Sequence, residues 1–185
     1  MHKYIWIFII GVILCFASCK KPVNFSDNQS LKVAFSNDTI TFDTVFTTLG
    51  SSTRHLMVYN NSDENLKISS IRLQNGNQSQ FAINVDGEAG YDFSDIEIYA
   101  KDSIYIFIKV TINPNDQNSP FFVEEKLLFE TNGNKQEVSL TAFGQNANYI
   151  VADQYIKGYP KFKMVADSLQ ETHWTSERPY VIYGY

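Results

Sequence analysis

Residues 104–112 of the chain have the sequence IYIFIKVTI, in which every second residue is an isoleucine or a valine. A hydrophobic period of two is typical of a β-strand with one buried face, because successive side chains point to opposite sides of a sheet. The aliphatic residues of this segment form the longest inward-facing row that the sequence predicts. We therefore expect a strand whose inner face packs on a hydrophobic core.

The same alternation recurs on both sides of this segment, over residues 31–143, with turn-forming residues between the repeats. Asn132-Gly133, between two alternating runs, is the strongest hairpin signal in the chain. Between Ile68 and Ile71 the inward phase slips by one residue, which predicts a β-bulge. Short strands at regular spacing, without helical periodicity, predict an all-β fold, an immunoglobulin-like antiparallel β-sandwich.

The composition fits one globular domain and argues against a nucleic-acid partner. The chain has 185 residues, of which 44% are hydrophobic and 15% aromatic, enough for one core of ordinary size. Its net charge is -5, and it has no dense cluster of Lys or Arg of the kind that binds a phosphate backbone. Both cysteines, Cys15 and Cys19, lie near the N-terminus, so the remaining chain has no thiol for a disulfide, a metal or a nucleophile.

The N-terminus has the features of an export signal. Lys3 precedes an apolar run over residues 4–16, about a dozen residues long as in a secretory signal peptide. The run ends in Phe16-Ala17-Ser18-Cys19, which resembles the lipobox of bacterial lipoproteins. The resemblance implies that residues 1–18 are removed and that acyl chains on Cys19 anchor the protein in a membrane. A transmembrane anchor and a signal peptide without lipidation are the alternatives.

The segment after Cys19 is expected to connect the lipid to the folded domain. Residues 19–30 are polar and irregular, which predicts a flexible tether. The predicted localisation is that of an outer-membrane lipoprotein, on the periplasmic or the cell-surface side. Lys20-Lys21 favours the periplasmic side, because surface lipoproteins of Bacteroidota often carry acidic residues at this place.

The order of several motifs, from Val58-Tyr59-Asn60 through Asn113-Pro114 to Val138-Ser139-Leu140, resembles immunoglobulin-like modules of the ASH or HYDIN-like class. A second resemblance, to Bacteroidota lipoproteins, rests on FDTVFTT at residues 42–48, NVDG at 84–87 and GQNA at 144–147. In those lipoproteins such a module precedes a right-handed parallel β-helix. The resemblance implies a sandwich over residues 31–147 and, over residues 148–185, a tail or linker that is the truncated start of a further domain. The alternative is that the tail folds back onto the sandwich.

The sequence gives little support to catalysis. Of the three histidines, His2 leaves with the signal peptide, His55 falls on a polar strand face and His173 lies in the tail. The Gly-x-Ser-x-Gly elbow of a serine hydrolase does not occur in the sequence. We therefore expect a protein that is not an enzyme and that has no cofactor.

One acidic loop is a weak candidate for calcium, since irregular sets of carboxylate oxygens can hold this ion. The alternative is a solvated loop between strands, and our prediction is no metal site. The four candidate ligands are Asp86, Glu88, Asp92 and Asp95.

Tyr105 and Phe107 occupy the outward positions of the strand whose inner side is already apolar. Exposed aromatic rings can stack on sugars, so these residues are candidates for contact with a ligand. Aromatic residues of this kind also meet neighbouring domains, and we favour that interpretation about two to one.

Short Asp-Ser/Thr-aliphatic sequences resemble the acceptor of general O-glycosylation in Bacteroidota. The alternative is that Asp and Thr simply flank the starts of strands. The four candidate acceptors are Thr39, Thr44, Ser103 and Ser168.

The predicted function is a non-enzymatic spacer module of a lipid-anchored cell-envelope protein, which holds a downstream or partner domain away from the membrane. The second hypothesis is a glycan- or protein-binding module, and the third is an accessory domain of a hydrolase. A solvent-facing aromatic platform would favour the second, and titratable residues converging in a pocket would favour the third.

Cys19→Ala is expected to abolish lipidation and signal-peptide processing, because alanine has no thiol to carry an acyl chain. Cells fed an alkyne analogue of palmitate should label the wild type and the control variant Cys15→Ala, but not Cys19→Ala. The latter should also migrate more slowly in electrophoresis, since it keeps its signal peptide. Equal labelling and migration of all three proteins would show that the lipoprotein assignment is wrong.

Overall fold

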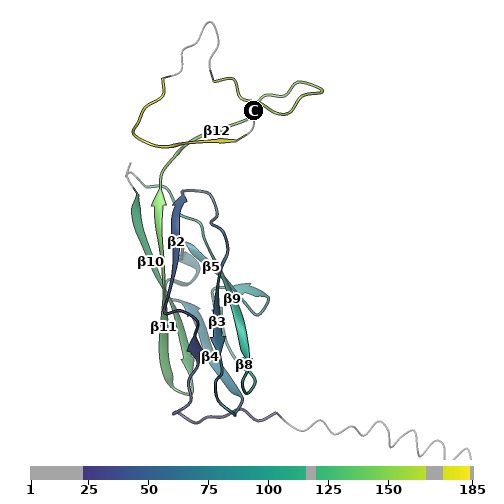
Figure 1. The fold of residues 1–185 in the computed structure, drawn as a ribbon, viewed down its shortest axis with the longest axis vertical. Helices are drawn as coiled ribbons and strands as arrows, with labels where there is room; N and C mark the ends of the chain where they lie inside the picture. The colour runs from purple at the N-terminus through teal and green to yellow at the C-terminus, as the bar shows by residue number, and fades with distance from the viewer. Residues whose placement is uncertain (1–22, 116–119, 166–172, 184–185) are drawn as a thin grey trace, which may run out of the picture.

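The computed structural model describes residues 23–115, 120–165 and 173–183. Over these ranges the chain forms two packed β-sheets and a small third sheet beyond one end (Figure 1). The predicted immunoglobulin-like β-sandwich is thereby confirmed. No helix in the described ranges is long and apolar enough to cross a bilayer. Cys19 and Ser168 lie outside these ranges.

The first sheet has the strand order β1-β3-β9-β5-β6, and each neighbouring pair is antiparallel. Its strands are β1 (Ala34–Phe35), β3 (Arg54–Tyr59), β9 (Ser103–Val110), β5 (Phe81–Val85) and β6 (Glu88–Gly90). The strand predicted to be the longest inward row, β9, lies in the middle of this sheet and is hydrogen-bonded on both edges.

The second sheet has the order β2-β11-β10-β4-β7, and β8 also pairs with β4. The pair of β2 and β11 is parallel, whereas the other pairs in this sheet are antiparallel. The 3-10 helix η1 (Gly76–Gln78) follows β4. The strands are β2 (Thr39–Phe46), β11 (Asn134–Gln145), β10 (Phe121–Thr131), β4 (Leu66–Leu73), β7 (Asp92–Phe93) and β8 (Ile96–Ile98).

The core lies between the two sheets and contains the inner row of β9. Its aliphatic residues from Ile104 to Val110 are all buried, as is Ile112 just beyond the strand, while Tyr105, Phe107 and Lys109 face solvent. Phe42 of the second sheet meets Phe81 of the first in an edge-to-face contact, with ring centroids 5.9 Å apart. This packing joins the sheets, and the period of two in the sequence correctly predicts which side of each strand takes part.

Both local signals in the sequence are confirmed. Asn132 and Gly133 have φ of 51° and 78°, and such positive angles are required by the tight turn between β10 and β11. The register of β4 against β10 shifts by one residue at Ser69, whose hydroxyl donates a hydrogen bond of 2.9 Å to the Glu130 carbonyl. The extra residue is the β-bulge that the phase slip predicts.

The described part of the expected tether is tied to one end of the sandwich. Asn65 donates through its side-chain amide to the carbonyl of Asn24, at 3.0 Å, and Asn132 donates to that of Asn28, also at 3.0 Å. Asn134 donates to the carbonyl of Gln29 at 2.9 Å. Side-chain amides of the sandwich thus satisfy backbone carbonyls between Asn24 and Gln29.

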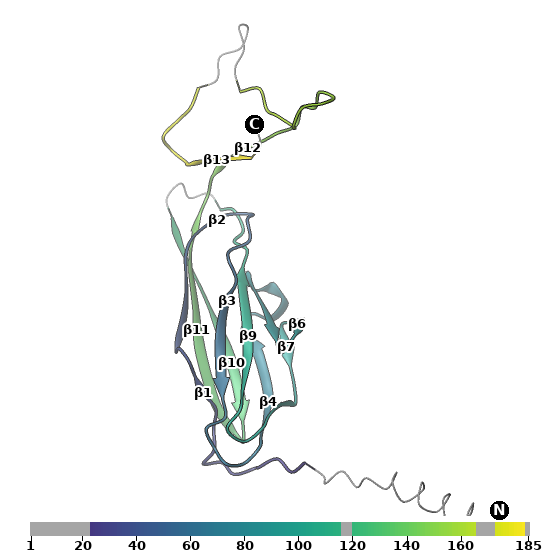
Figure 2. The same ribbon diagram turned by 45° about the vertical axis from the view of Figure 1, so that its right-hand side comes forward.

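The tail forms the third sheet, which lies past the opposite end of the sandwich (Figure 2). Its two strands, β12 (Asn148–Val151) and β13 (Tyr180–Tyr183), pair with each other in parallel. The Tyr149 hydroxyl donates a hydrogen bond to the Thr47 carbonyl of the sandwich. This pairing within the tail was not predicted from the sequence, because about thirty residues separate the two strands along the chain.

Gly144→Ala is expected to lower the free energy of unfolding by about 1–3 kcal/mol, as overpacking does. A Cβ at Gly144 would lie 2.6 Å from the Cζ of Phe121 and 2.8 Å from the Cγ2 of Ile112. Gly50→Ala is the control, because the nearest atom to its Cβ, the Thr111 Oγ1, is 3.8 Å away. Urea unfolding measures both changes, and equal loss in the two variants would contradict the packing described here.

Candidate functional site

The outward side of β9 presents two aromatic rings to solvent. Tyr105 is 46% exposed and Phe107 is 45% exposed. Their ring centroids lie 6.1 Å apart and their planes differ by 11°. Since β9 is paired on both edges, the backbone beneath the rings is held by the sheet on each side.

Side chains of β3 extend this surface. The register places His55 opposite Phe107 and Met57 opposite Tyr105, and the His55 and Tyr105 rings are 6.1 Å apart. We call these four residues the aromatic face. His55 is exposed, as expected for an outward-facing position, and the strand pairing places it beside the aromatic residues of β9.

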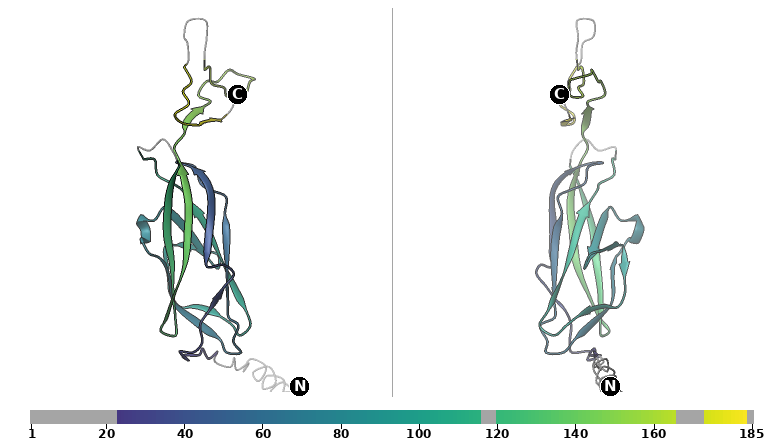
Figure 3. Two further views of the ribbon diagram at one scale, coloured as in Figure 1. Left: turned by 60° about the vertical axis from the view of Figure 1, so that its left-hand side comes forward. Right: turned by 90° about the vertical axis from the view of Figure 1, so that its right-hand side faces the viewer.

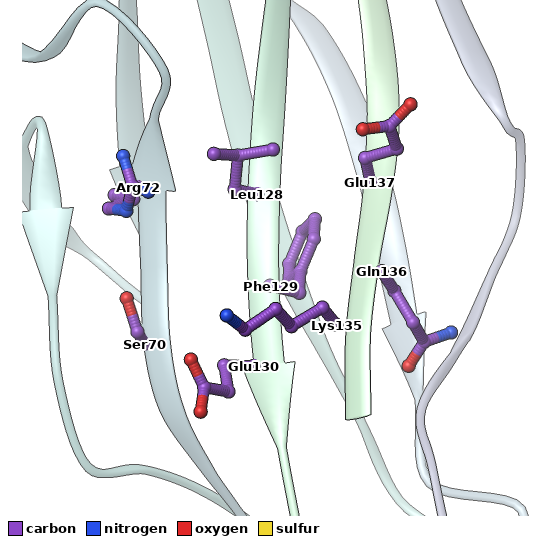
Figure 4. A pocket seen from close by; sticks show the side chains of 8 residues that line it. All are labelled: Ser70, Arg72, Leu128, Phe129, Glu130, Lys135, Gln136 and Glu137. Atoms are coloured by element: carbon purple, nitrogen blue, oxygen red, sulfur yellow. The ribbon is translucent and has the colours of Figure 1, made fainter. Parts of the chain in front are cut away.

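A second feature is an open hollow of about 340 Å³ on the outer side of the second sheet (Figure 4). Figure 4 shows Lys135 extending from β11 across β10, with Arg72 and Ser70 on the neighbouring strand β4. Beside it, Lys126 donates a hydrogen bond of 2.7 Å to Glu137, which raises the pKa of the Lys126 ammonium group above its usual value. The hollow is therefore a shallow, mixed-charge surface.

The acidic loop does not assemble a cation site. Asp86 lies in the turn between β5 and β6 of the first sheet, whereas Asp92 lies in β7 of the second sheet. The chain crosses from one sheet to the other between these residues, so Glu88 and Asp95 are also separated by the crossover. In the described ranges, no three side chains of His, Cys, Asp or Glu gather closely enough to hold a metal ion. The fold therefore does not gather Asp86, Glu88, Asp92 and Asp95 around one ion.

A buried carboxylate in β10 was not predicted from the sequence. Glu125 is 4% exposed, and its Oε2 accepts a hydrogen bond of 2.9 Å from the Asn75 side chain. Its Oε1 accepts one of 2.9 Å from the Lys126 backbone N–H. The sequence does contain a signal for the burial of Glu125, because this residue alternates in phase with the inward-facing Val123 and Leu127. Both carboxylate oxygens accept hydrogen bonds from neighbouring groups of the protein, so Glu125 acts here as a structural group.

The candidate acceptors for O-glycans differ in accessibility. Thr39 and Thr44 are exposed on β2, which is an edge strand of the second sheet. Ser103 is half-buried at the start of β9. The backbone N–H of Ser103 donates a hydrogen bond to the Asp102 carboxylate. Thr39 and Thr44 are therefore the accessible candidates among the three that the structure describes.

No protein-family model matches the sequence, and no curated protein matches it. Among solved structures, the ASH/PapD-like domain 7 of human CEP192 is similar at 14% identity and a TM-score of 0.38, over 71% of this chain and 94% of that one. A Porphyromonas gingivalis protein of unknown function is similar at 15% identity and a TM-score of 0.42, over 69% and 60% of the two chains.

A family 123 glycoside hydrolase from Clostridium perfringens is similar at 8% identity and a TM-score of 0.43, over 65% of this chain. The chain spans only 30% of that enzyme's length. Similarity at this level carries no information on function. A Bacteroidota origin, lipidation and a following β-helix stay predictions.

Protein made in a bacterium with the corresponding O-glycosylation system is expected to exceed the mass of its lipidated polypeptide. The double variant Thr39→Ala and Thr44→Ala should lose part of this excess. Thr41→Ala is the control, because Thr41 is exposed on the same strand but follows Ile40 in place of an aspartate. Intact-mass measurement decides, and a wild-type mass equal to the lipidated chain alone would remove the prediction.

Proposed function

We propose that this chain is a non-enzymatic spacer module of a lipid-anchored cell-envelope protein. A lipid on Cys19 anchors the chain in the membrane, and the sandwich forms a rigid body. The tail connects the sandwich to a parallel β-structure at its far end. The sequence resemblance and the arrangement of the two chain ends support this proposal.

The observation that carries the proposal is the placement of the two ends. Residues 24–30 are bound at the end of the sandwich that contains the β10–β11 turn. The tail leaves from the C-terminal end of β11, on the opposite side, in every view (Figure 3). Since Cys19 lies only four residues before Val23, a lipid on Cys19 would keep the first end close to the membrane.

The tail strands have the composition of parallel strands that are covered on both faces. β12 contains Tyr149-Ile150-Val151 and β13 is Tyr-Val-Ile-Tyr, so neither strand alternates with polar residues. Yet Val151, Ile182 and Tyr183 are exposed. A two-stranded sheet cannot cover such residues, and parallel strands stacked in a repeat would do so. This supports a further parallel strand against the tail, as the resemblance to β-helix lipoproteins implies.

A fluorescence energy-transfer measurement tests the spacer function. The mature chain has no cysteine apart from the lipidated Cys19, so single labels can be attached at Lys135→Cys, beside the β10–β11 turn, or at Tyr159→Cys, in the tail. β11 has 12 residues and spans roughly 40 Å between these ends. On vesicles with an acceptor lipid, transfer should be strong from position 135 and weak from position 159. Equal transfer from both positions would contradict a spacer role.

A further inference from the structure

We propose that the aromatic face of His55, Met57, Tyr105 and Phe107 binds an anionic glycan. The sugar rings would stack on Tyr105 and Phe107, and the acid groups would lie toward Lys109. This binding role goes beyond the spacer function, and neither depends on the other.

The ring geometry fits a chain of sugars. A sugar ring has an apolar face of C–H groups that packs on an aromatic ring, while its hydroxyls remain free for hydrogen bonds. Tyr105 and Phe107 give two such rings, nearly parallel and 6.1 Å apart along one strand. Across the strand, the register places His55 of β3 and Asn84 of β5 on either side of Phe107. Both have polar side-chain groups suited to sugar hydroxyls.

The backbone beneath the site is held by the sheet. β9 forms an antiparallel ladder with β3 on one edge and with β5 on the other. The inward neighbours Ile104, Ile106 and Ile108 are buried in the core, which fixes the strand from below. A rigid aromatic surface loses little conformational entropy when a ligand binds.

The charge of this face determines the class of glycan. The strands β3, β9 and β5 contain no Asp or Glu, although the whole chain has 20 acidic residues and a net charge of -5. Lys109 follows Phe107 on the same outward side of β9, and no carboxylate within the described ranges forms an ion pair with it. An isolated cation beside the rings is complementary to a carboxylate or sulfate on a sugar.

The charges at the two ends of the aromatic face also determine the orientation of the bound glycan. Asp86, in the turn after β5, donates its backbone N–H to the Tyr105 carbonyl and is exposed. The Tyr105 end of the face is therefore next to an acid, and the Phe107 end is next to Lys109. An anionic group on the glycan belongs at the Phe107 end.

The face is open to an external partner. It lies along the flank of the sandwich, whereas the tail and the N-terminal segment lie beyond its two ends (Figures 1 and 2). Domains that continue the chain would enter at those ends. This placement favours a free glycan over the contact with a neighbouring domain that the sequence analysis prefers.

Isothermal titration of the mature chain with tetragalacturonic acid, and with cellotetraose as the neutral comparison, tests the proposal. The acidic oligosaccharide should bind, more weakly as salt is added, and the double variant Tyr105→Ala and Phe107→Ala should weaken it at least about tenfold. Lys109→Gln should weaken the acidic oligosaccharide more than the neutral one.

The matched control is the double variant Phe122→Ala and Phe143→Ala. These rings are 55% and 45% exposed on the outer side of the second sheet, with centroids 5.5 Å apart, and their loss should leave binding unchanged. Urea unfolding of both double variants checks that each is folded. Absence of binding, equal loss in the control, or stronger binding of the neutral oligosaccharide would overturn the proposal. So would a dimer of the wild type that Tyr105→Ala and Phe107→Ala dissociate, since a second copy would then occupy the face.

Discussion

The inner row of β9, which starts at Ile104 and continues just past the strand to Ile112, packs against the second sheet, and the rest of the structure depends on this contact. Each of these residues is buried, and Leu127, Phe129, Val138 and Leu140 of the opposite sheet are buried as well. The cysteines lie near the N-terminus, so the sandwich has no disulfide to hold its sheets together. Burial of apolar side chains, at about 25 cal/mol per Å², is therefore its main source of stability.

The same strand explains why the two proposed roles can coexist in one small domain. Its inward side chains fix the sandwich as a rigid body, which a spacer requires. Its outward side chains take no part in the core, so Tyr105, Phe107 and Lys109 are available for a ligand. The ends of the sandwich, and not its flank, connect to the N-terminal segment and to the tail (Figure 2).

Local features of the structure could be predicted from the sequence, whereas long-range ones could not. The strand alternation, the Asn132-Gly133 turn and the bulge near Ser69 depend on residues close together in the chain. The crossover that separates Asp86 from Asp92 depends on which strands pair, and pairing does not show in the alternation. For this reason the sequence could suggest an acidic cluster that the fold divides between two sheets.

The candidate site shows the same difference between local features, which the sequence predicts, and long-range ones, which it does not. Period two predicted that Tyr105 and Phe107 point outward, but only the pairing of β3 with β9 adds His55 and Met57 to them. Glu125 occupies an inward position that alternation marks, yet its partner Asn75 comes from a turn fifty residues away. The pairing of β12 with β13 likewise joins segments that are far apart in sequence.

The central proposal is that the sandwich folds as a unit of its own, independently of the tail. Urea unfolding of the mature chain, compared with a chain that ends at Ala147, tests this claim most directly. The free energy of unfolding of the sandwich should be the same in both, within about 1 kcal/mol, because the inner row of β9 is intact in each. A loss of several kcal/mol on removing residues 148–185 would instead show that the tail is an integral part of the sandwich.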